Sequence, residues 1–218
     1  MVMFESRNEN IAERIYQDNI SDIVRHMIAN GIQTACQVSR NILTDASAMG
    51  IPRSKAFNTA CNLTFLINST MTKAIDENNL AKLTYDEQRT GHGRPIVHYM
   101  SGKVVFHIKK ERSAEKLPHG AKYRREETKK NEQILLLDEP QEEVRANMVV
   151  TFNHKNFQVQ YIQIGMIDPE YQTWLGRWPL LSYIQPENVE RMRKEYGEPL
   201  EEQARELIRK DFRLEMRR

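Results

Sequence analysis

The sequence has few cysteines, glycines and prolines, and it lacks a long hydrophobic run. Its 218 residues include nine glycines and eight prolines, too few for a collagen-like or low-complexity chain. No apolar run approaches the ~20 residues that a membrane-spanning helix needs. The first residues are charged from Glu5 onward and show no apolar core of a signal peptide. We therefore expect a cytoplasmic protein with no membrane partner.

Cysteine is limited to Cys36 and Cys61, each inside a segment with a helical pattern. Lone cysteines with apolar or small neighbours are usually buried, reduced thiols. A disulfide between them would require Cα atoms within about 7 Å, a distance that sequence alone leaves open. No CxxC or Cys/His cluster has the spacing of a zinc site. The sequence indicates no metal and no cofactor.

The order of hydrophobic patterns predicts an α+β protein with a real core. We expect a helical subdomain over 1–85, an antiparallel sheet of four or five strands over 86–185, and an amphipathic C-terminal helix over 186–218. In the first region, helices are predicted over 5–31, 34–49 and 55–78. The first of these should break near Asp18 and end at Gly31, and the second should end at Gly50.

Two hairpins are predicted in the sheet region. Residues 95–100 and 103–109 flank the dipeptide Ser101–Gly102, and 146–152 precede 157–164. A turn at Ser101–Gly102 would pair His98 with Val105 and make His98 and His107 diagonal neighbours about 7–8 Å apart. Alternation would place one set of side chains on the core face: Val97, Tyr99, Val104, Phe106 and Ile108.

Other segments of this region have weaker patterns. Residues 86–93 read as a linker, 110–131 as a loop followed by a short helix, and 134–137 as a buried strand. Asp168–Pro169 is typical of a helix start, so Trp174 and Trp178 would share one helical face as a core seal. The C-terminal helix should be interrupted at Gly197–Pro199.

Positive charge is concentrated in the middle of the chain, although the net charge is only +2. Residues 88–130 hold 12 Lys and Arg against 4 Asp and Glu, whereas the flanking regions are neutral or acidic. Four of the six histidines also lie in this block: His92, His98, His107 and His119. Such a block is either a solvated surface or the contact region for a polyanion.

The block predicts nucleic-acid binding, with cleavage of RNA as a narrower hypothesis. Tyr99 or Tyr123 could stack on bases. In the narrower hypothesis, His98 and His107 would act as general base and acid without a metal, and Lys109 would stabilise the transition state. Lysines and arginines of the block would neutralise backbone phosphates: Arg94, Lys103, Lys110, Arg112, Lys122, Arg124 and Arg125.

A second class of function is a protein–protein module, such as an inhibitor, an antitoxin or an assembly component. The basic block would then meet an acidic partner, and the C-terminal helix would dock. Under either interpretation the helices could also form a homo-oligomer. No HExxH, GxSxG or Walker sequence is present, and the segment 106–109 lacks the carboxylate that a metal-dependent nuclease strand would need.

Overall fold

The computed structural model describes residues 2–54, 56, 62–78, 82–89, 95–119, 122–137 and 145–215. For residues 2–6, 78, 88–89, 95, 122–124, 137 and 211–215 it describes the backbone only. The chain divides into two compact units. The sheet unit comprises Met1–Arg25, Asn79–Asn153 and Tyr161–Ser182, and the helical unit comprises His26–Asn78, His154–Gln160 and Tyr183–Arg218.

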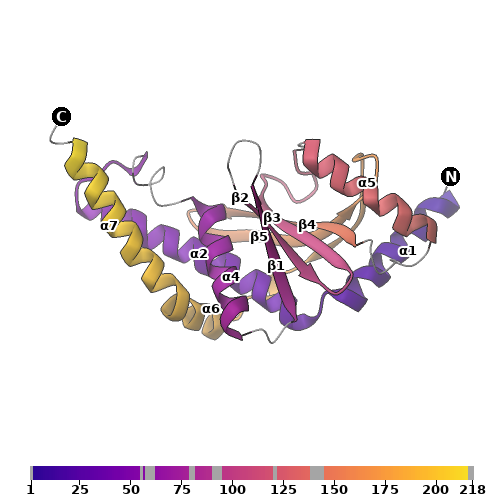
Figure 1. Cartoon of the computed structure of the whole chain (residues 1–218), viewed down its shortest axis with the longest axis horizontal. Helices are drawn as coiled ribbons and strands as arrows, with labels where there is room; N and C mark the ends of the chain where they lie inside the picture. The colour runs from indigo at the N-terminus through magenta and orange to yellow at the C-terminus, as the bar shows by residue number, and fades with distance from the viewer. Residues whose placement is uncertain are drawn as a thin grey trace. The chain divides into compact units, whose positions relative to one another are not determined.

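The sheet unit contains the first helix, the strands and one crossover helix (Figure 1). The six strands lie in sequence order within one sheet. In chain order the elements are α1 (Val2–Asn19), β1 (Leu83–Arg89), β2 (Pro95–Ser101), β3 (Val104–Lys110), α5 (Lys122–Leu137), β4 (Ala146–Lys155), β5 (Gln158–Ile167) and β6 (Trp174–Pro179).

The α+β class is confirmed, but the sheet is larger and of mixed direction. β1 with β2, β2 with β3, and β5 with β6 pair antiparallel, whereas β3 and β4 pair parallel. β1 forms where a linker was expected. Residues 134–137 are the last turn of α5 and not a strand, because parallel neighbours need a long crossover and this helix supplies it. A short apolar run cannot be assigned by periodicity alone.

The β2–β3 hairpin forms as expected, but its register is shifted. Ser101 pairs with Val104, so the turn is Gly102–Lys103. Asn19 at the end of α1 explains the shift, because its carbonyl accepts from Ser101 Oγ at 2.5 Å and its Oδ1 accepts from Lys103 N at 2.7 Å. Gly102 has φ +53°, and a Cβ there would meet Asn19 Oδ1 at 2.5 Å.

The two faces of the sheet differ in polarity. The predicted core face is confirmed, since Val97, Tyr99, Val104, Phe106 and Ile108 are all buried. α1 packs on this face, where Tyr16 stacks on Trp178 with ring centroids 4.2 Å apart. The opposite face buries polar side chains instead: His98, His107, Asn147, Thr151 and Gln163.

Trp174 and Trp178 lie on a strand, so the predicted helix after Asp168 is wrong. Asp168 instead organises a turn, with Oδ1 accepting from the backbone N–H of Gln172 and Thr173. The register shifts at Met166/Ile167, where β5 passes from pairing with Gly176 to pairing with Trp174. This β-bulge reverses the alternation, so Trp174 faces the polar side and Trp178 the core side.

The helical unit is built from long helices. Its elements are α2 (Asp22–Ala48), α4 (Leu63–Asn78), η1 (Leu181–Tyr183), α6 (Pro186–Met192), η2 (Arg193–Gly197) and α7 (Glu198–Glu215). The predicted stop at Gly31 is wrong, because α2 runs through it and Met71 of α4 packs where a Cβ would sit, at 2.9 Å. The stop at Gly50 is confirmed by its φ of +71°.

The predicted interruption near Gly197–Pro199 takes the form of a widened turn. η2 is a five-residue π-helix that joins α6 to α7. Cys36 is buried and not in a disulfide, as expected for a reduced thiol, and Cys61 lies outside the described residues. Within the described residues, no helix combines the length and the apolar character needed to cross a membrane.

We predict that Gly165→Ala destabilises the sheet unit by about 1–3 kcal/mol through overpacking. A Cβ at Gly165 would meet Trp174 ring atoms at 2.5 and 2.7 Å and the Gly176 carbonyl oxygen at 2.9 Å. Chemical denaturation measures the loss. Adding Trp174→Ala should recover part of it, and a double variant no more stable than Gly165→Ala would contradict the proposed clash.

Candidate nucleic-acid interface

α5 is fixed to the polar face of the sheet by one buried side chain, Asn131, which is 0% exposed. Its Nδ2 donates to the carbonyls of Asn147 (3.1 Å) and Ile167 (3.0 Å). Its Oδ1 accepts from Asn147 N at 2.8 Å. In return, Asn147 Nδ2 donates to the Glu127 carbonyl at 2.9 Å. This network fixes the position of α5 over β4 and β5, and with it the position of Glu127.

Glu127 reaches from α5 to the two predicted catalytic histidines. Its Oε1 lies 2.8 Å from His98 Nε2. The His98 and His107 rings meet edge to face, with centroids 6.3 Å apart. Because the true register has Tyr99 opposite Phe106, the next pair along places these histidines directly opposite, not diagonally. The structure therefore brings His98 and His107 together and adds a carboxylate.

Burial and charge act in opposite directions on Glu127. Burial acts to raise the pKa of this carboxyl. The hydrogen bond from His98 and the charges of His107, His98 and Lys130 outweigh burial, so the Glu127 pKa lies below its usual value. Glu127 therefore remains ionised in the folded protein above that pKa.

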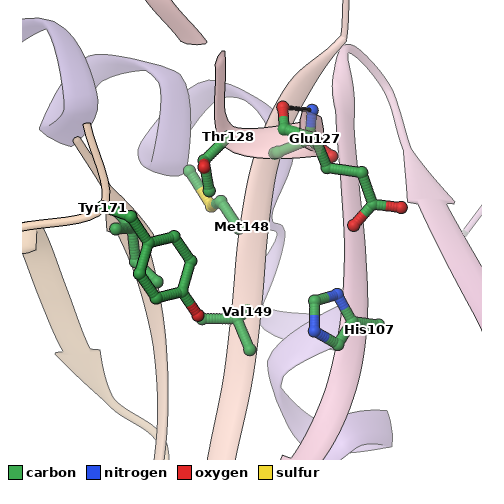
Figure 2. Close-up of a pocket in the computed structure, with 8 residues that line it drawn as sticks. His107, Glu127, Thr128, Met148, Val149 and Tyr171 are labelled. Carbon is green, nitrogen blue, oxygen red and sulfur yellow. Dashed lines mark hydrogen bonds between the residues drawn. The ribbon is translucent and has the colours of Figure 1, made fainter. Parts of the chain in front are cut away.

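A small pocket opens beside His107 and Glu127 (Figure 2). It has about 10 Å³ open to the centre of a water molecule, room for about one water. Figure 2 shows His107 and Tyr171 on opposite sides of Val149. The histidines are only 7% and 9% exposed. The pocket is therefore large enough for a water molecule but too small for a phosphodiester.

Tyr171 closes this pocket from the turn that follows β5. Its φ is +62°, an uncommon conformation for a bulky residue. The turn imposes it, because Tyr171 N donates to the Asp168 carbonyl and the Asp168 side chain caps the following N–H groups. The Tyr171 hydroxyl donates to the Pro118 carbonyl at 2.9 Å, and the Arg125 guanidinium lies 6.0 Å from its ring centroid. Tyr171 thus connects α5 with the loop after β3.

That loop, residues 111–119, is held to the sheet through its carbonyl groups and is called the anchored loop below. Burial, with the charge of Glu111, raises the pKa of Tyr161 to about 12, so its hydroxyl keeps the proton that it donates. The donors are Tyr161 Oη to Glu111 O, Asn153 Nδ2 to Arg112 O, Gln163 Nε2 and Arg177 Nη1 to Ala114 O, Trp174 Nε1 to Glu115 O, Tyr171 Oη to Pro118 O and Lys109 Nζ to His119 O.

The anchored loop and α5 gather several of the predicted phosphate contacts. Lys110 and Arg112 are exposed at the start of the loop. Arg125 is exposed on α5 and is tied to the loop through Tyr171. Because hydrogen bonds hold the loop backbone to the sheet, the exposed Arg112 side chain starts from a fixed backbone position.

Other predicted residues do not join this group. Lys103 sits in the hairpin turn, at the opposite end of β3 from Lys110, about 20 Å away for a strand of this length. The Lys109 ammonium pairs with Glu111 and is directed away from the histidines. Tyr99 is 0% exposed and stacks on Phe106, so its ring is not open to a base. Arg94 and His92 lie outside the described residues, as do the side chains of Lys122, Tyr123 and Arg124.

Sequence reasoning missed Glu127, Asn131, Tyr171, Trp174 and Arg177. Each acts on a partner far away in the sequence, such as Arg177 on Ala114, 63 residues earlier. No local signal marks Asn131 either, because its neighbours in sequence, Lys129, Lys130, Glu132 and Gln133, are all polar. Among the described residues, no group of three or more His, Cys, Asp or Glu could hold a metal ion.

We predict that Asn131→Leu destabilises the sheet unit by about 3 kcal/mol or more. Three buried backbone groups would lose a partner, each costing about 1 kcal/mol or more. Urea denaturation gives the free energy of unfolding. Gln133→Leu, at an exposed position two residues away on α5, is the matched control and should change it by less than about 0.5 kcal/mol. Equal effects of both changes would contradict the anchoring role.

We also predict a pH-dependent effect of Glu127→Gln on stability. The folded-state pKa of Glu127 is lowered, so its ionised form contributes stability above the unfolded pKa of about 4.5, and this is lost as pH falls through the folded pKa. The wild type should therefore be more stable than the variant at pH 6, and the difference should shrink in acid below about pH 4.5. Melting temperatures across pH measure it, with Glu132→Gln as the control. A difference that stays constant with pH would refute the prediction.

No protein-family model, no curated protein and no solved structure matches this chain. Its own residues and geometry therefore carry the functional proposal.

Proposed function

We propose that the sheet unit binds nucleic acid along the anchored loop and the adjoining face of α5. The observation that carries this proposal is the set of hydrogen bonds that fixes the carbonyls of the loop to the sheet while its cations stay exposed. Binding a polyanion then orders few additional groups, and this lowers the entropic cost of association.

The charges of this surface favour phosphate. The loop carries Arg112 and Lys116 against Glu111 and Glu115, and Lys110 at the end of β3 directly precedes it. Glu111 is already paired with Lys109. α5 adds Arg125 and, one helical turn later on the same face, Lys129. β6 adds Arg177, whose Nη1 is bonded to the loop. Arginines suit phosphate because their planar guanidinium offers paired donors.

The same geometry favours binding over cleavage. His98 and His107 are nearly buried beneath α5, and the space beside His107 fits about one water. A general acid or base must come within hydrogen-bond reach of the atoms it serves. RNA cleavage by this pair remains a hypothesis. Its test is RNA cleavage in EDTA by His98→Ala and His107→Ala, in which loss of activity in both variants would support it.

We predict that Arg112→Gln, Lys116→Gln and Arg125→Gln together weaken nucleic-acid binding about 10–100-fold at ~0.1 M salt. They should also lower the slope of log affinity against log salt by about 2, because three phosphate contacts are lost. Binding to labelled single-stranded RNA, single-stranded DNA and duplex DNA is measured by fluorescence anisotropy.

A matched control changes the same net charge in the helical unit: Lys73→Gln, Arg191→Gln and Lys210→Gln. This triple variant should bind as the wild type does. Equal loss in both triple variants would show attraction by net charge alone and would contradict the assigned surface. Negligible, salt-independent binding by the wild type would refute the function and favour a protein–protein module with an acidic partner.

A further inference from the structure

We infer that the nucleic acid is single-stranded and that Trp174 stacks on one of its bases. This inference rests on the proposed function and specifies its substrate class. Its basis is Trp174, whose side chain β6 presents beside the anchored loop.

The bulge in β6 gives Trp174 its position. Without the shift at Met166/Ile167, alternation would place Trp174 on the same face as Trp178, against α1. With the shift, the indole lies over Gly165 on the polar face, where a Cβ at Gly165 would meet its ring at 2.5 Å. Bulges commonly redirect a side chain in this way, and glycine in a strand often marks a close approach.

The Trp174 ring is held as a platform. The Cε3 and Cζ3 atoms of its six-membered ring lie against Gly165, and Nε1, on the other side of the indole, donates to the Glu115 carbonyl at 3.1 Å. The side chain nonetheless remains partly exposed. An aromatic ring that is held at two sides and is still partly exposed loses little further freedom when a base stacks on it. Trp178 differs, because it stacks on Tyr16, which in turn carries Arg25 over its ring at 4.5 Å.

Cations flank this platform. Arg177 is paired with Gly165 in the register and donates to Ala114 O, while Trp174 binds the next carbonyl along the loop. Lys116 is the next residue of the loop, directly after the acidic Glu115. Charge at this position is therefore modest, and stacking adds attraction that charge alone does not supply. Aromatic platforms beside cations suit single strands, because duplex bases are already stacked on one another.

Single-tryptophan variants test the inference directly, since Trp174 and Trp178 are the only two tryptophans of the chain. Trp178→Phe leaves Trp174 as the sole tryptophan emitter, and Trp174→Phe leaves Trp178. The ligands are oligo-dT and oligo-U of about 20 nucleotides, a DNA duplex, and heparin as a polyanion without bases. Each variant is first checked for a cooperative melt.

Single strands should quench the Trp178→Phe variant and leave the emission of Trp174→Phe nearly unchanged. Trp174→Ala should lose about tenfold affinity for single strands but none for heparin, whereas Trp174→Phe should retain most of the affinity because a ring remains. If Trp174→Ala fails to fold, the quenching of the two phenylalanine variants still decides the question.

Two failures are distinguishable. Salt-dependent binding of duplex and heparin as tight as that of single strands, with unchanged Trp174 emission, would overturn the stacking inference and leave the proposed function standing. No binding of any of these polyanions would refute both.

Discussion

The arrangement of the sheet unit depends on the carboxamide of Asn131. A helix that packs on a sheet normally does so through apolar side chains, and such contacts tolerate sliding. Here one amide satisfies two carbonyls and one N–H of the strands below it. Hydrogen bonds are directional and their loss is costly when buried. The helix is therefore held in one position, and Glu127, Thr128 and Arg125 are placed with it.

The candidate site lies on the polar face of the sheet, and the two faces have different roles in the fold. The apolar face supplies the core, where Tyr99, Phe106 and Phe152 are buried. On the other face, His98 and Asn147 bond to Glu127 of α5, and Gln163 bonds to a carbonyl of the anchored loop. The polar residues of this face therefore hold the anchored loop and α5 in place, whereas the apolar residues of the other face form the core.

Sequence patterns predicted the features that neighbouring residues determine. The alternation of apolar and polar residues predicted the β2–β3 hairpin and its core face. Successive side chains of a strand point to opposite faces, so a strand with one buried face has an apolar residue at every second position. The predicted register of this hairpin was wrong because the position of the turn is set by Asn19, which lies 82 residues before Ser101. The parallel pairing of β3 with β4, the helical end of α5 and the bulge before Gly176 were not predicted. They too depend on contacts between residues far apart in the sequence. Of the site, the histidines and loop cations could be predicted by residue type. Glu127, Asn131, Trp174 and Arg177 could not, since their roles arise from contacts made only in the folded chain.

The parallel pairing of β3 with β4 also affects how fast the sheet can assemble. The hairpins on either side of this joint close over two-residue turns and can form within microseconds. The joint itself requires the whole stretch between Lys110 and Ala146 to be looped back before its first ladder bond forms. The slowest part of assembly should therefore be the meeting of two preformed hairpins under α5. Until that moment the β3 edge of one and the β4 edge of the other are open to pairing with another chain.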